Sequence, residues 1–368
     1  MTNPLVALGD LGQSPWYDYI TRDLVRGGEL ARLIAEDGLL GMTSNPTIFE
    51  KAVSGSALYD DDIRRLAAEG RTAAQIFEAL AVADVQEACD AFAGVHRRTD
   101  GVDGLVSLEV SPTLAQDTEA TVAEARRLWA AVNRANAMIK IPGTLEGLPA
   151  VTRCLAEGIN VNVTLLFSVE RYRQVIEAFL QGVEQAAAVR PDVVGRLASV
   201  ASFFVSRLDG KVDGWLDANG GARALRGTAA IANACAAYGV FQETFRGPRW
   251  EALAARGARV QRALWASTST KDPAYPDVYY VEALVAPQTV NTLPPATFDA
   301  YRDHGQPAIR IGAGVARAPG QLRALAAAGI DLAAITQTLE VEGVKSFATS
   351  YADLLAGIEA KAGALAER

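Results

Sequence analysis

Leu105-Val-Ser-Leu-Glu-Val-Ser111 is the stretch that decides the fold, because apolar and polar side chains alternate along it. Every second residue of a β-strand points to the same side. One face therefore carries two valines and a leucine, and the other carries Ser107, Glu109 and Ser111. The stretch 160–166, Asn-Val-Asn-Val-Thr-Leu-Leu, divides its faces in the same way. Parallel strands are usually apolar on both faces, so the repeated polar face predicts a functional site on the inner side of the sheet.

Strand-like runs of this kind recur along the chain, separated by longer stretches rich in Ala, Leu, Glu and Arg with helical periodicity. The predicted strands are Trp16–Ile20, Leu40–Asn45, Leu105–Ser111, Ala137–Ile141, Asn160–Leu166, Ala198–Val205, Arg262–Thr268 and Thr289–Leu293. Amphipathic helices are predicted at 117–132, 169–188 and 222–238. Eight strands with helical crossovers favour an α/β fold, the closed (β/α)8 TIM barrel, over an open doubly wound sheet. An antiparallel sheet with one face in water is the alternative for any single strand.

The 368 residues fit a single domain, 1–368, since barrels with insertions reach this length as one unit. Two connections are longer than an ordinary crossover, so helical insertions are predicted at about 46–104 and 208–260. Beyond residue 294 the pattern is helical again, which predicts additional C-terminal helices at about 295–368. No low-complexity linker and no internal repeat divides the chain.

Composition and charge narrow the functional class. Half of the residues are hydrophobic and the formal net charge is -8, so a large core is available and a broad basic face for nucleic acid is not. Any anionic ligand must therefore meet locally placed cations. Cys89, Cys154 and Cys235 are too scattered for a disulfide framework or a thiolate metal site. No signal-peptide pattern and no apolar run of membrane-spanning length is present, which predicts a cytoplasmic protein that binds no membrane.

Lys140 is the sharpest single signal, since it alone among the lysines lies in the middle of a predicted strand, between two isoleucines. Burial of an ammonium group is costly, so a lysine in this position favours the neutral amine. A neutral amine attacks carbonyl groups and forms imines. A lysine that protects an exposed strand edge is the alternative, and the inward polar residues of the neighbouring strands favour the nucleophile.

Three other residues on predicted strands, Glu109, Asp18 and Thr164, suit proton transfer, which imine formation and aldol cleavage both need. For either acid alone, an ion pair with arginine or a helix cap is the alternative interpretation. Asn45 begins Asn-Pro-Thr, which is also typical of a turn that starts a helix.

Other chemistries lack the residues they need. The only histidines, His96 and His304, provide neither a metal cluster nor a catalytic triad. Gly312-Ala-Gly314 begins like a dinucleotide-binding loop, but Arg317 occupies the third glycine position. We therefore expect no metal and no cofactor.

Four motifs resemble the signatures of the transaldolase family. They are Thr43-Ser-Asn-Pro-Thr47, Val106-Ser-Leu-Glu-Val-Ser-Pro112, Met138-Ile-Lys-Ile-Pro-Gly-Thr144 and Asn160-Val-Asn-Val-Thr-Leu-Leu-Phe-Ser168. Their order and spacing also match, and the resemblance covers most of the chain. It implies a class I aldolase barrel of the longer-chain bacterial-type branch, and it places the family's Schiff-base lysine at Lys140.

The same resemblance implies roles for the polar residues near Lys140. Glu109 and Thr164 would hold a catalytic water, and Asp18 would be the acid and base at the hydroxyl of the bond that is cleaved. The residues that would hydrogen-bond the dihydroxyacetone unit are Asn45, Asn162 and Ser202.

For the phosphate group, the resemblance implies contacts with Arg207, which follows the sixth strand, and with Ser267 on the seventh. The chain departs from the family at Ser269, where an arginine is usual. Lys271 would supply the missing cation.

The implied reaction is the transaldolase step of the pentose phosphate pathway: sedoheptulose 7-phosphate and glyceraldehyde 3-phosphate give erythrose 4-phosphate and fructose 6-phosphate. Sugar phosphates are thus the expected partners, and a homodimer is expected from the resemblance alone. A fructose 6-phosphate aldolase is the nearest alternative, although that group carries tyrosine and glutamine at the positions of Phe204 and Glu109. A catalytically silent scaffold and a homologue of a specialised pathway are the others, and Ser269 leaves the last one open.

Overall fold

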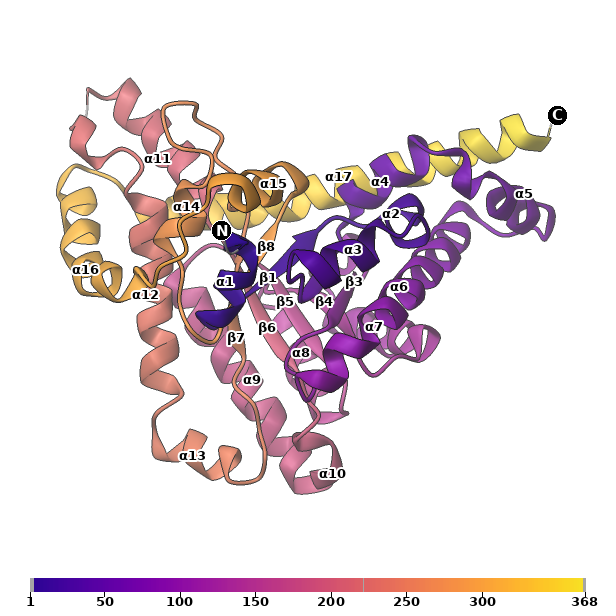
Figure 1. Cartoon of the computed structure of the whole chain (residues 1–368), viewed down its shortest axis with the longest axis horizontal. Coiled ribbons are helices and arrows are strands. Elements are labelled where there is room, and N and C mark those ends of the chain that lie inside the picture. The colour runs from indigo at the N-terminus through magenta and orange to yellow at the C-terminus, as the bar shows by residue number, and fades with distance from the viewer. Residues whose placement is uncertain (1–2, 221, 367–368) are drawn as a thin grey trace.

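The computed structural model describes residues 3–220 and 222–366, and its parallel strands form a closed barrel in chain order (Figure 1). The strands are β1 (Gln13–Asp18), β2 (Gly41–Thr43), β3 (Leu105–Glu109), β4 (Ala137–Pro142), β5 (Val161–Leu166), β6 (Ser199–Phe204), β7 (Arg262–Ala266) and β8 (Thr289–Leu293). All neighbouring strands pair in parallel. The predicted (β/α)8 barrel is confirmed, and the antiparallel alternative is wrong. Residues 1–2 and 367–368, the ends of the predicted domain, lie outside the described residues.

The first strand differs most from its prediction, because β1 begins at Gln13 rather than at Trp16. The Gln13 side chain is buried and donates hydrogen bonds to Leu284 O at 2.8 Å and to Thr289 Oγ1 at 3.0 Å. A polar side chain that is satisfied in this way can lie inside a sheet, and the sequence alone does not reveal the partners.

Helices surround the barrel and occupy its long connections. The α-helices are α1 (Pro4–Asp10), α2 (Arg22–Arg26), α3 (Glu29–Glu36), α4 (Pro46–Ser54), α5 (Asp60–Ala68), α6 (Ala73–Arg98), α7 (Thr118–Val132), α8 (Gly147–Ala156), α9 (Val169–Val189), α10 (Pro191–Val194), α11 (Ser206–Ala218), α12 (Ala229–Thr244), α13 (Pro248–Ala254), α14 (Tyr279–Ala283), α15 (Pro295–His304), α16 (Ile311–Ala327) and α17 (Leu332–Ala366). Short 3-10 turns are η1 (Ala57–Tyr59), η2 (Pro112–Leu114) and η3 (Arg223–Leu225). The helix predicted at 222–238 begins later, as α12, because Gly227 has a φ of +67°, outside the helical region.

The longest connections each hold several of these helices. Between β2 and β3 lie α4, η1, α5 and α6, and between β6 and β7 lie α11, η3, α12 and α13. After β8 the chain continues as α15, α16 and α17. The last of these is a long helix that packs against α4, α5 and α6 and is drawn in yellow in Figure 1. Among the described residues no single helix has the length and hydropathy of a membrane span, and α16 and α17 meet that test only as a pair bent by 94°.

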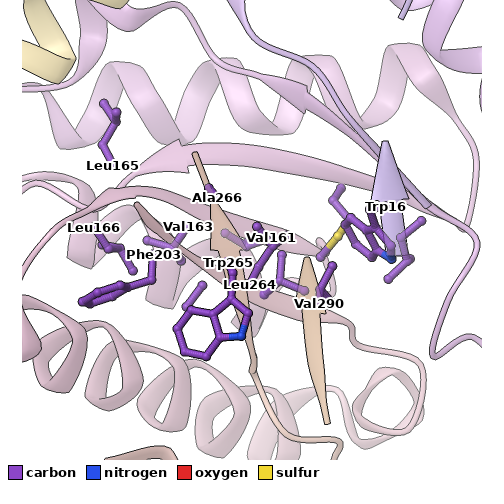
Figure 2. Close-up of a cluster of buried hydrophobic side chains, with 14 of the residues drawn as sticks. Trp16, Val161, Val163, Leu165, Leu166, Phe203, Leu264, Trp265, Ala266 and Val290 are labelled. Carbon is purple, nitrogen blue, oxygen red and sulfur yellow. The ribbon is translucent and has the colours of Figure 1, made fainter. Parts of the chain in front are cut away.

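Large buried side chains fill the barrel below its carboxyl end and the space between sheet and helices (Figure 2). Trp16 lies on the same face of β1 as Asp18, and its indole Nε1 donates to Asp103 Oδ1 at 3.2 Å. A Cβ on Gly41 would lie 2.5 Å from the Trp16 ring, so β2 needs glycine there. Trp16 is fully buried beneath Asp18 and fills the barrel interior there.

Candidate active site

A cavity of about 430 Å³ opens where the barrel strands end, which is the position of the active site in barrel enzymes. Every predicted site residue except Glu109 and Asn162 lines it: Asp18, Asn45, Lys140, Thr164, Ser202, Phe204, Arg207, Ser267 and Lys271. Glu109 lines a neighbouring cavity of about 700 Å³. Residues that are distant in the sequence therefore meet in one space.

Lys140 lies on the inner face of β4, and its side chain is only 5% exposed. Its Nζ donates to Ser44 O at 3.0 Å and lies 3.3 Å from Glu109 Oε2. The strand register produces this arrangement, because Lys140 pairs with Glu109 of β3 on one side and with Asn162 of β5 on the other. Residues in register on parallel strands point to the same side of the sheet. The closed barrel leaves no strand edge for this lysine to protect.

A buried carboxyl group, Glu109, and a half-buried one, Asp18, lie near the amine. Burial raises the pKa of Glu109 to about 7, the attraction of Lys140 opposes this change, and the charge of Asp18 adds to it. Burial also raises the pKa of Asp18, against the attraction of Lys140 and a hydrogen bond of 2.6 Å from Thr43 Oγ1. A carboxyl group with a pKa near 7 can both accept and release a proton at neutral pH.

A chain of hydrogen bonds crosses three strands beside the lysine. Ser202 Oγ donates to Asn162 Oδ1 at 2.7 Å, and Asn162 Nδ2 donates to Ser107 Oγ at 3.0 Å. These side chains are buried, as is Thr164, the next inward residue of β5. Among the residues that the structure describes, the Thr164 hydroxyl has no hydrogen-bond partner. The chain thus fixes the orientation of the Asn162 amide, and the Thr164 hydroxyl can bond to a ligand.

Asn45 has a structural contact as well as a place in the cavity. Its Oδ1 accepts a hydrogen bond of 3.0 Å from Ile48 N and caps α4, with Pro46 at the first helical position. The alternative from the sequence, that Asn45 starts a helix, is therefore confirmed, and the cap uses the side-chain oxygen. Its amide nitrogen is left for other contacts within the cavity.

The cationic end of the cavity lies beyond β6 and β7. Arg207 is half-buried near the start of α11, with its guanidinium carbon 5.2 Å from the centre of the Phe204 ring. Burial lowers the pKa of Arg207 from its ordinary value, and the attraction of Asp18 opposes the change. Ser267, at a φ of +54°, turns the chain after β7. Lys271 Nζ donates to Ser269 Oγ at 2.7 Å, so its ammonium lies beside the serine that departs from the family pattern.

Several residues in or beside the cavity are not among the predicted site residues. Thr43 and Ser44 belong to the quoted Thr-Ser-Asn-Pro motif, and their contacts with Asp18 and Lys140 depend on the pairing of β2 with its neighbours. Lys51 of α4 lines the cavity as a further exposed cation. Phe347 of α17 lines it as well, and nothing in the sequence distinguishes this residue from an ordinary core aromatic.

Metal-ligating residues do not gather here or elsewhere in the described part of the chain: no group of three His, Cys, Asp or Glu residues there could hold an ion. The carboxyl end of this parallel barrel holds a buried amine, a buried carboxyl group and a half-buried one. This is the architecture of a barrel enzyme with acid–base chemistry.

Comparisons with known proteins agree on a family. A family model described as Transaldolase/Fructose-6-phosphate aldolase matches residues 15–358. A transaldolase of Acidothermus cellulolyticus is 54% identical over 362 residues, which are 97% of this chain and 96% of the relative. A transaldolase of Frankia alni is 51% identical over 368 residues, 99% and 98% of the two chains. A transaldolase of Thermobifida fusca is 51% identical over 360 residues, 96% and 97% of the two chains. The chain therefore belongs to the transaldolase and fructose-6-phosphate aldolase family.

Proposed function

We propose that this enzyme is a transferase that moves a three-carbon dihydroxyacetone unit from sedoheptulose 7-phosphate to glyceraldehyde 3-phosphate, in the pentose phosphate pathway. The products are erythrose 4-phosphate and fructose 6-phosphate. The observation that carries the proposal is the buried Lys140 amine, 3.3 Å from Glu109, beside a cavity that Arg207 and Lys271 also line. Relatives about half identical over nearly the whole chain bear the transaldolase name.

In the first step, Lys140 Nζ attacks the ketone carbon of the donor sugar and forms an imine with loss of water. Glu109 has a pKa of about 7, so it can take the proton of the amine and later protonate the departing hydroxyl. Thr164 offers its hydroxyl on the same inner face. We propose that Glu109 and Thr164 hold the water molecule that carries protons between the amine and the departing hydroxyl.

In the second step, Asp18 accepts the proton of the hydroxyl next to the bond that breaks. The electrons of the carbon–carbon bond move into the protonated imine, an aldose phosphate leaves, and an enamine remains on Lys140. Asn45, Asn162 and Ser202 are the proposed partners of the oxygens of this three-carbon unit. The enamine then attacks the aldehyde of the second sugar phosphate, and water releases the product.

Transfer requires that the enamine wait for an aldehyde without being protonated. The apolar ring of Phe204, which contacts Phe167 and Arg207, offers no proton at the cavity wall. This favours transfer over the release of free dihydroxyacetone by an aldolase. A silent scaffold is not favoured either, because Lys140, Glu109 and Asp18 are all present and close together.

We assign the sugar phosphate to the cationic end of the cavity. Arg207 has no ion-pair partner among the described residues, and a guanidinium group can bind a phosphate through two parallel hydrogen bonds. Ser267 would add a hydroxyl donor. Lys271 would supply the positive charge of the arginine that the family usually has at the position of Ser269. A different sugar phosphate remains the alternative substrate if this replacement changes the distance to the imine.

Borohydride reduction in the presence of fructose 6-phosphate tests the central step. We expect a three-carbon adduct on Lys140, lost in Lys140→Ala and kept in Lys51→Ala, a matched control in the same cavity. Erythrose 4-phosphate should then convert the unreduced intermediate to sedoheptulose 7-phosphate. Release of dihydroxyacetone without transfer would identify an aldolase, and the absence of any adduct would identify a scaffold.

We also propose a cytoplasmic location and a homodimer, which rest on the family resemblance and on three free, buried cysteines. Sedimentation velocity of the purified protein tests the dimer, and a monomer mass at micromolar concentration would contradict it.

A further inference from the structure

The C-terminal helix α17 forms part of the catalytic cavity wall, although it is remote from Lys140 in the sequence. Its Phe347 is 4% exposed and lines the cavity. The centre of the Phe347 ring lies 5.6 Å from Lys140 Nζ, which is within the range of a cation–π contact. An aromatic face therefore lies beside the nitrogen that becomes a protonated imine.

Contacts on both sides of Phe347 hold α17 in this position. Before it, Glu340 forms a largely buried ion pair of 3.2 Å with Arg171 of α9. After it, the hydroxyls of Ser350 and Thr47 lie 2.7 Å apart. Lys361 donates to one backbone carbonyl at the end of α4 and to one that follows it. The helix is thus tied to segments that follow β2 and β5, and these strands carry parts of the site.

A second contact of α17 is with the backbone irregularity in β5. Leu165 has a φ of +62°, and the register of β5 against β6 shifts between Val163 and Leu166. Such a bulge adds a residue to one strand and redirects its side chains. Figure 2 shows Leu165 apart from Val163 and Leu166. Leu165 packs against α17 so closely that a Cβ on Gly343 would lie 3.1 Å from Leu165 Cδ2 and 3.4 Å from the Phe167 ring.

The position of Thr164, directly before Leu165, connects these contacts to the chemistry. A left-handed backbone in a branched residue is strained and persists only where its surroundings hold it. Gly343 allows the helix backbone to approach and hold Leu165. The orientation of the Thr164 hydroxyl, which is buried on the inner face of β5, depends on that support.

We propose that α17 positions the catalytic amine and its water: Phe347 covers the imine on Lys140, and Gly343 holds the β5 bulge that directs Thr164 into the cavity. This inference rests on the proposed function and adds two positioning residues to it. The Phe347 ring stabilises the protonated imine through its face and excludes water from it. In the absence of the ring, water reaches the enamine and gives a proton to its carbon, water then adds to the resulting iminium carbon, and the carbon–nitrogen bond breaks. Dihydroxyacetone and the free Lys140 amine are the products.

The partition between transfer and hydrolysis tests the role of Phe347. Dihydroxyacetone release and sedoheptulose 7-phosphate formation are measured together, from fructose 6-phosphate with and without erythrose 4-phosphate. We expect the ratio of release to transfer to rise roughly ten-fold in Phe347→Ala, because water then reaches the enamine, and to rise less in Phe347→Leu, which keeps the apolar bulk. Tyr351→Ala, one turn further along α17, is the matched control and should leave the ratio unchanged.

A glycine pair on the same helix tests the support of the bulge. Gly343→Ala should slow the formation of the borohydride-trapped adduct in a single turnover roughly ten-fold, because a displaced Leu165 moves Thr164. Gly357→Ala is the control, since a Cβ there meets nothing within 4 Å, and it should leave that rate unchanged. Thermal unfolding of each variant separates this effect from a loss of folded protein.

These outcomes separate the inference from the proposed function. An unchanged partition in both Phe347 variants, or an equal rise in Tyr351→Ala, overturns the role of the ring while adduct formation and transfer persist. Equal adduct rates in Gly343→Ala and wild type overturn the role of the bulge. Absence of the adduct in wild-type enzyme would instead overturn the proposed function.

Discussion

Replacement of Glu109 by Gln isolates the energetic effect of burying one carboxyl group in this barrel. The side chain is 3% exposed, and burial raises its pKa from an ordinary 4.5 to about 7. In the folded chain Glu109 keeps its proton to higher pH than in the unfolded chain. Between pH 4.5 and 7 the folded state therefore binds more protons, and the free energy of unfolding falls as the pH rises through this window.

The size of this loss follows from the interval between the two pKa values. At about 1.4 kcal/mol per pKa unit, ionisation of Glu109 lowers the free energy of unfolding by about 3 kcal/mol once the pH exceeds 7. In a chain of this length the same change lowers the melting temperature by roughly 4 °C. Glutamine keeps the shape of the side chain and does not ionise, so the Glu109→Gln variant escapes this loss.

Thermal and urea unfolding of wild type and Glu109→Gln at pH 5 and pH 8.5 measure the effect. Asp18 titrates in both proteins, so the difference between the two pH dependences reports Glu109 together with its interaction with Asp18. We expect the wild type to lose about 2.5 kcal/mol more than the variant between these pH values, because a small part of the loss has already occurred at pH 5. Parallel pH dependences would refute the reasoning, since they would mean that burial does not hold the proton on Glu109. Transfer activity of the variant should fall roughly 100-fold or more, because general acid–base catalysis is lost.

Two further predictions concern the neighbours of the amine and the phosphate end. Thr43→Val removes a hydrogen bond that lowers the pKa of Asp18, so the acidic limb of the pH–rate profile should move to higher pH. Thr43→Ser keeps the hydroxyl and should leave the limb in place. An unmoved limb in Thr43→Val would contradict the role of this hydrogen bond. Lys271→Ala should raise the KM for glyceraldehyde 3-phosphate roughly ten-fold, and the double change Ser269→Arg with Lys271→Ala should restore it. Steady-state kinetics measure both effects. An unchanged KM in Lys271→Ala would mean that Lys271 does not take the place of the family arginine.

The inward-facing part of the site can be predicted from the sequence, because two simple periodicities determine it. Alternation fixes which face of β3 carries Glu109 and which face of β5 carries Asn162 and Thr164. Parallel register then brings both strands to the two sides of Lys140. Carboxyl ends of parallel strands meet at one end of a barrel, so the common location of these residues follows from the fold.

Contacts supplied by other segments cannot be predicted in this way. Phe347 reaches Lys140 only through the path of α17 across the barrel, and the sequence of a packed helix does not state which surface it packs on. The start of β1 at Gln13 depends on buried partners in distant segments. The bulge at Leu165 requires a left-handed residue, and leucine gives no signal of one.

The hydrogen-bond chain from Ser107 through Asn162 to Ser202 raises the question of whether this polar layer supports the fold or the substrate. A buried polar group that loses its partner costs roughly 1–3 kcal/mol, whereas replacement of all partners by apolar groups of similar shape is nearly neutral. Asn162→Ala leaves the hydroxyls of Ser107 and Ser202 without their shared partner, so we expect it to lower the free energy of unfolding by roughly 2–5 kcal/mol.

The triple variant Ser107→Ala, Asn162→Leu and Ser202→Ala removes the whole chain of hydrogen bonds and keeps the bulk of the central side chain. If the layer serves the substrate, the triple variant should unfold within about 1 kcal/mol of wild type and lack transfer activity, while Asn162→Ala is both unstable and inactive. Urea unfolding with a parallel transfer assay compares the three proteins. A triple variant as unstable as Asn162→Ala would mean that the barrel itself depends on these bonds. In the expected case, the polar interior exists because a sugar must be bound there, and the three side chains satisfy one another so that the barrel can bury them at little cost.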